Sequence, residues 1–115
     1  MTLNVLFVDD EASMCEVFAD VFASEDIAVT TFTAPEKALA WAKTNKPDLI
    51  FLDYVLPGTT GDEIARQIEH NVPIYLVTGM PNLKTKFPFV RVFGKPFKES
   101  EIRDVMLNHR ESRKL

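Results

Sequence analysis

The sequence is poor in cysteine and has no long hydrophobic run. Cys15 is its only cysteine, so no disulfide can form within the chain, which fits a reducing compartment. No apolar segment approaches the roughly 18 residues that a membrane-spanning helix needs, and no basic region precedes an apolar stretch at the N-terminus. These absences argue against a disulfide-stabilised secreted domain and against a membrane protein, and they predict a cytoplasmic location.

Basic residues are also in short supply. The chain has 13 Lys and Arg against 17 Asp and Glu, which gives a net charge of -4. Because nucleic-acid backbones attract clustered cations, this balance argues against direct binding to DNA or RNA. We interpret the basic tail, residues 110–115, as a frayed helix end or the start of a linker rather than as a binding arm.

What the sequence does contain suits one compact domain. Of its 115 residues, 46% are hydrophobic and 26% are charged. A chain of this size buries roughly 65% of its unfolded surface. No repeat, low-complexity tract or long linker divides it. We therefore expect a single domain over residues 1–115.

Short runs rich in Val, Ile and Phe alternate with segments of helical periodicity. Five such runs are predicted to be strands: 3–8, 27–33, 49–52, 74–77 and 90–93. Between the first two lies a helix with the apolar stripe Met14, Val17, Phe18, Val21 and Phe22, among which Cys15 is expected to be buried. The strands are apolar throughout, as in parallel sheets with helices on both faces. The predicted fold is a doubly wound α/β sheet.

Two further helices have the same predicted start, a Thr followed three residues later by a Glu. The pairs Thr33 with Glu36 and Thr60 with Glu63 have the spacing of a capping box. A last helix carries Ile102, Val105 and Met106, and Trp41 fits either the core or the surface. We place His70 and His109 on the third and last helices, as surface or structural residues away from the strand ends.

Polar side chains follow four of the five predicted strands. They are Asp9 and Asp10, Asp53, Thr78, and Lys95. In doubly wound sheets ligands bind beyond the carboxyl ends of the strands. Three converging carboxylates repel one another unless a cation neutralises them, and oxygen ligands suit Mg²⁺ or Mn²⁺. The hydroxyl and the lysine supply what a transferring phosphoryl group requires, although each residue alone is as simply a cap, a turn former or a solvated side chain.

Four stretches carry a resemblance to a known family: LFVDDE, DLIFLDYVLPGTTGDE, YLVTG and VFGKPF, in this order. Together they resemble the receiver domains of response regulators in two-component signalling. The resemblance implies a flavodoxin-like sheet of order 2-1-3-4-5 and a signalling switch rather than an enzyme. It also implies that Asp53 takes a phosphoryl group from a phosphohistidine on a sensor histidine kinase or a histidine phosphotransfer protein.

The resemblance also assigns roles around that acceptor. Asp10 would bind Mg²⁺ directly and Asp9 largely through water, with Asp53 and the backbone carbonyl of Val55 completing the protein ligands. Thr78 would donate to a phosphoryl oxygen and Lys95 would pair with it, on a Lys95–Pro96 bond that is usually cis in the family. Pro57, Gly58 and Gly61 match the family's loop before the third helix, and Gly79 leaves access open beside the threonine.

One departure concerns the family's aromatic residue three positions before the lysine. That position is Val92, and Phe93 cannot replace it because neighbouring residues of a strand point to opposite faces. The coupling between threonine and aromatic residue is therefore in doubt.

A second departure is the short interval between the last two strands. Pro81 and Pro88 bracket it and leave at most six residues for a helix, so the fourth helix is predicted to be shortened or missing. Phe87 and Phe89 then either anchor an output partner or a second copy of the chain on a remodelled face, or fold inward to fill the space. The cognate kinase and the output partner are not indicated by the sequence.

Two alternative functions fit less well. A haloacid-dehalogenase-like phosphatase also uses an aspartate at a strand end, but it places a second acid two residues later, where this chain has Val55. A receiver-shaped scaffold that is never phosphorylated would not need the complete set of acceptor-site residues. Phosphate incorporation from acetyl phosphate with Mg²⁺ discriminates between a scaffold and a receiver.

Overall fold

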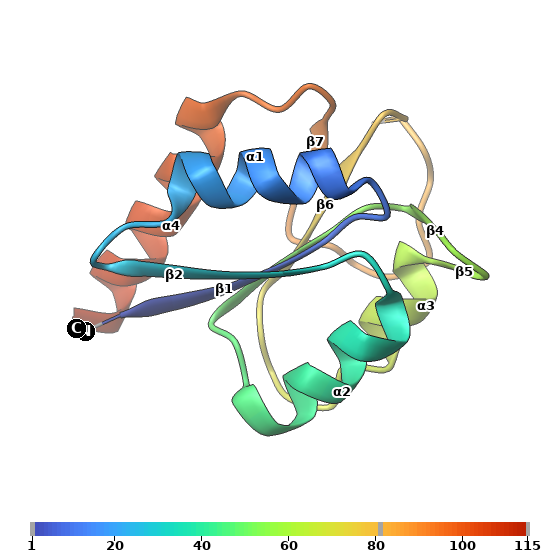
Figure 1. The fold of residues 1–115 in the computed structure, drawn as a ribbon, viewed down its shortest axis with the longest axis horizontal. Helices are drawn as coiled ribbons and strands as arrows, with labels where there is room; N and C mark the ends of the chain where they lie inside the picture. Colours follow the sequence, from blue (N-terminus) through green and yellow to red (C-terminus); the bar gives the residue numbers. More distant parts are fainter. Residues whose placement is uncertain (1, 81, 115) are drawn as a thin grey trace.

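The computed structural model describes residues 2–80 and 82–114, with side chains through residue 111. Pro81 and Leu115 lie outside the described residues, and with them the predicted helix start at Pro81 and the end of the basic tail. The main sheet has five parallel strands in the order β2-β1-β3-β6-β7, as predicted (Figure 1). Their bounds are β1 Leu3–Val8, β2 Ile27–Phe32, β3 Leu49–Leu52, β6 Ile74–Thr78 and β7 Val92–Gly94.

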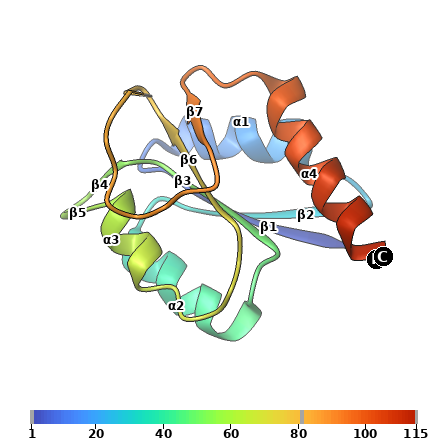
Figure 2. The same ribbon diagram turned by 180° about the vertical axis from the view of Figure 1, so that it is seen from behind.

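Four helices cover this sheet in the described part of the chain. They are α1 Ala12–Phe22, α2 Pro35–Asn45, α3 Gly61–Arg66 and α4 Glu99–Lys114. Helices α1 and α4 lie on one face and α2 and α3 on the other, which both views show (Figures 1 and 2). A short antiparallel hairpin, β4 Val55–Leu56 and β5 Thr59–Thr60, leads from β3 into α3. Among the described residues, no helix is long and apolar enough to cross a membrane.

The sheet separates two apolar cores because successive strand residues point to opposite faces. In β1, Val5 and Phe7 belong to the first core, under α1 and α4, whereas Leu6 and Val8 belong to the second, under α2 and α3. All four side chains are at most 1% exposed. A strand buried on both faces needs apolar residues at every position, which explains the continuous apolar runs of the sequence.

Phe18 is at the centre of the first core. Its ring lies 4.1 Å from that of Phe7, 4.7 Å from that of Phe22 and 5.4 Å from that of Phe51. Cys15 is buried, as predicted, but Val17 is 47% exposed, so its assignment to the core-facing stripe was wrong. The buried positions of α1 are 15, 18 and 22, and residue 17 lies outside the helix face centred on them.

The N-cap half of the capping-box prediction is confirmed at one helix, and the prediction is wrong at the other. At α3, the Thr60 side chain accepts a hydrogen bond from the Glu63 N–H at 3.3 Å. At α2 the N-cap is Ala34 and makes no side-chain cap. Pro35 suits the first helical position because its fixed φ matches the helix and its missing N–H is not needed there. The helix therefore begins at Pro35, and Thr33 lies one residue before the cap.

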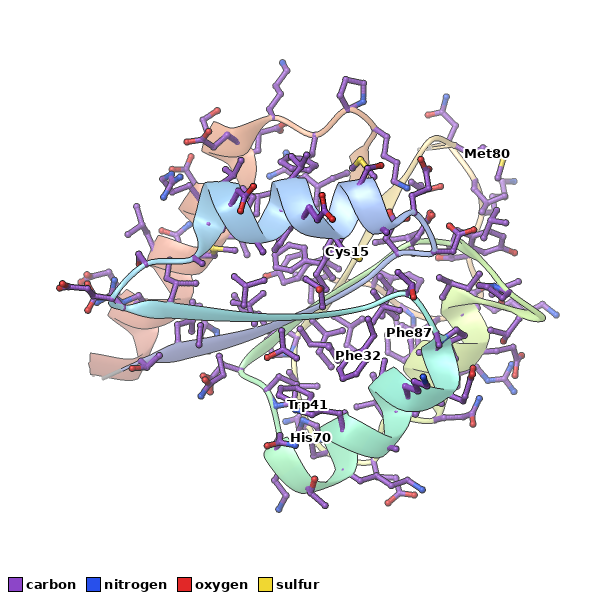
Figure 3. All side chains as sticks on the ribbon, in the orientation of Figure 1. Cys15, Phe32, Trp41, His70, Met80 and Phe87 are labelled. Carbon is purple, nitrogen blue, oxygen red and sulfur yellow. The ribbon has the colours of Figure 1, made fainter. Side chains whose placement is uncertain are left out.

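The region after α3 departs further from the sequence prediction. Bonds of the i to i+3 type, from Gln67 N to Ile64 O and from Ile68 N to Ala65 O, close the helix early. His70 lies beyond its end, so the placement of His70 on the third helix was wrong, whereas His109 does lie on the last helix. Trp41 is half-buried, packs against the second core and lies 6.1 Å from the ring of Phe32 (Figure 3).

The fourth helix of the predicted pattern is missing, as expected. Residues 82–91, within the described part of the chain, form no helix. From 82 to 90 the even-numbered residues are exposed and the odd-numbered ones half-buried, which is the two-residue period of an extended chain. Phe87 and Phe89 pack against the second core with their rings 5.0 Å apart. They therefore adopt the inward arrangement and fill space that a helix would have covered.

The central position of Phe18 predicts a large loss of stability on truncation. Phe18→Ala should lower the free energy of unfolding by about 3–5 kcal/mol, because it removes a fully buried ring and leaves a cavity. Urea denaturation measures this loss. Val17→Ala is the matched control on the same helix, and we expect a change of less than about 0.5 kcal/mol because its side chain is exposed. Equal losses for the two variants would contradict the observed orientation of α1.

Candidate functional site

The carboxyl ends of four parallel strands bring the predicted site residues to one edge of the sheet. Asp9 follows β1, Asp53 follows β3, Thr78 ends β6, and Lys95 comes directly after β7. The Asp53 N–H donates to the Val8 carbonyl at 2.9 Å, so the acceptor strand is in register with β1 up to the site. Residues from four distant parts of the sequence are thus placed by strand pairing alone.

Lys95 joins the two buried acids of this edge. Its Nζ lies 2.6 Å from Oδ2 of Asp9 and 2.9 Å from Oδ2 of Asp53. Asp9 is completely buried and Asp53 is 7% exposed. Buried charges are tolerated when they are paired and their remaining lone pairs are satisfied. The other carboxylate oxygens accept backbone N–H groups, of Glu11 for Asp9 at 2.9 Å and of Tyr54 for Asp53 at 2.7 Å.

The electrostatic balance differs between the two partners. Burial raises the pKa of Asp53 above its ordinary value, and the hydrogen bond and charge of Lys95 only partly oppose this effect. Burial lowers the pKa of Lys95, but hydrogen bonds and charge from Asp9 and Asp53 outweigh burial, so its pKa is raised overall. The protonated form of Lys95 is therefore stabilised, whereas the ionised form of Asp53 is destabilised by burial.

Three carboxylates of the site are close enough to share a cation. One oxygen from each of Asp9, Asp10 and Asp53 lies within 4.8 Å of the others, and Asp10 is exposed. Three carboxylates with the ammonium of Lys95 have a formal charge of -3 + 1 = -2. Hard divalent cations such as Mg²⁺ prefer oxygen ligands and would balance this charge. The carboxylates of Asp9, Asp10 and Asp53 therefore fit the predicted Mg²⁺ or Mn²⁺ site.

The remaining predicted residues lie at the same edge of the sheet as Asp53. Thr78 is 1% exposed, and its hydroxyl accepts the Met80 N–H at 3.2 Å. A Cβ built on Gly79 would meet no atom within 4 Å, which agrees with the open approach expected there. Val55 begins β4, two residues after Asp53, and its side chain is 55% exposed. The role of its carbonyl as a metal ligand stays a prediction.

Gly61 allows the loop after Asp53 to close tightly. A Cβ at this position would lie 2.6 Å from the backbone oxygen of Asp53, a distance that real contacts do not show. The Gly61 N–H donates to the Tyr54 carbonyl at 2.7 Å. Gly58, within the same loop, has a φ of +72°, in the left-handed region that favours glycine. The two glycines let α3 begin directly against the backbone of the acceptor.

The departure at Val92 is visible in the side chains of β7. Phe93 is 3% exposed and lies in the first core, whereas Val92 packs against the second core. Phe93 therefore points away from the face of Val92, the position at which the family's aromatic residue is absent, as expected. The Lys95–Pro96 bond is cis, which was also predicted.

One residue near the site was not foreseen from the sequence. Asp62 in α3 is 6% exposed, and its carboxylate accepts the backbone N–H of Lys86 at 3.0 Å. Acids are common in the first turn of any helix, where they usually face solvent, so the sequence offered no signal of this contact.

Comparison with known families and proteins agrees with this geometry. The family model described as the response regulator receiver domain matches residues 5–106. The cyclic di-GMP phosphodiesterase response regulator RpfG of Xanthomonas campestris is 38% identical over 85 residues, which cover 66% of this chain and 22% of that protein. The phosphate regulon transcriptional regulatory protein PhoB of Pseudomonas aeruginosa is 32% identical over 109 residues, covering 86% and 48% respectively. The chain thus spans less than half the length of these relatives.

Solved structures share the fold. A CheY-like response regulator receiver domain from Methylobacillus flagellatus superposes with a TM-score of 0.85 at 20% identity and covers 95% of this chain and 99% of that one. The signal receiver domain of an HD domain-containing protein from Pseudomonas fluorescens gives a TM-score of 0.86 at 18% identity, with 97% of each chain covered.

The raised pKa of Asp53 predicts a gain of stability when its charge is removed. With divalent cations chelated, Asp53→Asn should raise the urea midpoint at pH 7, and Lys95 keeps its contact with Asp9. A raised pKa in the folded state means that the folded protein binds this proton more tightly, so its stability falls as pH rises through that range. The advantage of asparagine should therefore shrink as pH falls below the raised pKa of Asp53. Asp20→Asn, which changes an exposed acid, is the control, and a lower midpoint for Asp53→Asn at pH 7 would mean that pairing with Lys95 outweighs burial.

Proposed function

The chain belongs to the family of response regulator receiver domains of two-component systems, and from this premise we propose that Asp53 is its phosphoacceptor. The observation that carries the proposal is the position of Lys95, whose ammonium contacts Oδ2 of Asp53 and Oδ2 of Asp9 at 2.9 and 2.6 Å. A cation held beside the nucleophile by a second carboxylate stays in place when the first carboxylate changes its charge. The coarse function, a signalling switch, follows from family membership.

We propose the following transfer. A carboxylate oxygen of Asp53 attacks the phosphorus of a phosphohistidine on a sensor histidine kinase or histidine phosphotransfer protein. The new O–P bond forms while the P–N bond breaks, and the imidazole leaves. Asp53 is 7% exposed and the backbone N–H of Tyr54 holds its Oδ1, so the nucleophile is oriented before the donor arrives.

Charge stabilisation is assigned to the neighbours of Asp53. Asp9, Asp10, Asp53 and the Val55 carbonyl would hold Mg²⁺, or Mn²⁺, which when bound supplies positive charge to the phosphoryl oxygens. Lys95 is close enough to Asp53 to pair with a phosphoryl oxygen after transfer. Thr78, buried at the end of β6, would donate its hydroxyl to another of these oxygens. In this proposal the chain assists its own phosphoryl transfer and loss without acting on a separate substrate.

The biological context of the switch is a proposal as well. We propose that residues 1–115 form a single receiver domain that works in the cytoplasm, either alone or joined to an output domain. The relatives named above include a cyclic di-GMP phosphodiesterase and a transcriptional regulatory protein, so their names point to no common output. We propose no direct nucleic-acid contact for this chain, because its net charge is -4. A second copy of the chain is one candidate partner.

Replacement of the acceptor tests the assignment. Wild-type protein incubated with acetyl phosphate and Mg²⁺ should gain one acid-stable, base-labile phosphoryl group, and Asp53→Asn should gain none, because the amide is not a nucleophile. Intact-mass measurement and peptide mapping detect the modification. Asp62→Asn, at the other buried acid after β3, is the matched control and should still be modified at Asp53. Undiminished phosphate on Asp53→Asn would refute the assignment, and no phosphate on the wild type would favour the scaffold.

The metal assignment has its own test. Asp10→Ala should weaken Mg²⁺ binding by about tenfold or more, since it removes a carboxylate ligand of a hard cation. Calorimetric or fluorescence titration of the unphosphorylated protein measures the affinity. Glu25→Ala removes an exposed acid on the α1–β2 connection and should leave the affinity within about twofold. Equal affinities for the two variants would remove Asp10 from the metal site.

A further inference from the structure

Asp62 is a buried carboxylate that the proposed phosphoacceptor chemistry does not use. Its side chain is 6% exposed, and Oδ2 accepts the Lys86 N–H at 3.0 Å across 24 residues of sequence. The other oxygen, Oδ1, is buried and has no hydrogen-bond partner among the described residues. Gly61, Ile64 and Ala65 of the same helix are buried as well, whereas Glu63 is exposed.

Burying the carboxylate of Asp62 costs free energy that a specific interaction must offset. Removing a charged group from water carries a large penalty, and one oxygen of Asp62 gains no hydrogen bond in return. An apolar side chain beside the second core would avoid that penalty. The bond to Lys86 is therefore the contribution of Asp62 that an apolar residue could not make.

The segment that Asp62 holds is the loop that replaces the fourth helix. Its end is fixed by the Val90 N–H, which donates to the Ile74 carbonyl at 3.0 Å. Its middle is fixed by Asp62 at Lys86, next to Phe87, and Phe87 packs against the second core. Figure 3 shows Phe87 on the α2 and α3 side of the sheet, the side on which Phe32 also lies. Asp62 thus holds the loop at Lys86, the residue before the inward-packed Phe87.

The other end of the contact reaches the phosphoacceptor. Gly61, next to Asp62, has no space for a Cβ against the backbone oxygen of Asp53 and donates its N–H to Tyr54. Interiors packed this closely transmit displacement because there is no void to absorb it. A shift of the Asp53 backbone therefore moves the start of α3 and with it the carboxylate of Asp62.

We propose that Asp62 is a positioning residue that transmits the phosphorylation state of Asp53 to loop 82–90. The transmission runs from Asp53 through Gly61 and Asp62 to the Lys86 N–H. This route would replace the coupling through the family's aromatic residue, which is absent here. Val92 stands at that position and packs against the second core, and Phe93 faces the first core. This proposal rests on the proposed function, because it needs Asp53 to accept a phosphoryl group.

The test compares Asp62→Leu with the parent by amide NMR before and after phosphorylation with acetyl phosphate and Mg²⁺. Leucine suits the apolar surroundings but is larger than aspartate, so the smaller Asp62→Ala is prepared beside it. We expect Asp53 to be modified at a rate within about threefold of the parent. The Lys86 amide of the unmodified variant should exchange with solvent at least tenfold faster, because it loses its acceptor. The shifts that phosphorylation causes at Lys86 and Phe89 in the parent should fall to less than about a third in the variant.

Two further variants separate positioning from a structural role. Asp62→Asn keeps an oxygen that can accept the Lys86 N–H and should restore most of the shifts. Glu63→Gln changes the adjacent exposed acid and should behave as the parent. Asp62→Ala takes the place of Asp62→Leu if the latter does not fold.

The outcomes distinguish this proposal from the proposed function. Parent-like shifts at Lys86 and Phe89 in phosphorylated Asp62→Leu would overturn the transmission even if that variant were less stable. Unchanged exchange of the Lys86 amide would overturn the contact itself. A parent that takes up no phosphate would overturn the proposed function and the transmission together, while the exchange measurement on unmodified protein would still decide the contact.

Discussion

The contact of Lys95 with Asp9 and Asp53 is the interaction on which the proposed chemistry of this structure depends. It joins residues 86 and 42 positions apart in the sequence, and each arrives at the end of a different strand. No local element can form it. Strands β1, β3 and β7 must all be paired in register first, and the helices on both faces must cover the sheet that aligns them. The site is therefore complete only when these strands are in register, and any loss of register removes it.

Two opposing electrostatic effects meet at the same contact, the burial of Asp53 and its pairing with Lys95. Asp53 is buried, its pKa is raised by that burial, and it shares a lysine with a completely buried acid. The folded protein thus holds negative charge where solvation is poor, and the exposed carboxylate of Asp10 adds to it. A site of this kind favours incoming positive charge and responds to any group that changes the local balance. The burial of Asp53, the proposed phosphoacceptor, therefore costs the folded protein stability.

Much of the fold and site could be read from the sequence, because both depend on patterns that local physics enforces. Continuous apolar strands required a sheet covered on both faces, and polar residues at four strand ends indicated one shared edge. The predictions that were wrong concern residues whose position depends on contacts with neighbouring residues. Val17 fits an apolar stripe but lies outside the buried helix face, and Pro35 rather than Thr33 sets the start of α2. Asp62 looked like an ordinary acid of a first helical turn, because its partner is a backbone group that no sequence pattern identifies.

The alternation of loop 82–90 has a consequence for how this protein can diverge. Leu83, Thr85, Phe87 and Phe89 are half-buried, whereas the residues between them are exposed. Every second side chain of the loop therefore points outward, where a single change leaves the packed residues undisturbed. An extended segment separates the two sets completely. Mutation can therefore rewrite the outward residues one at a time under neutral drift, and selection for a new partner can act on this surface without first compensating a damaged core.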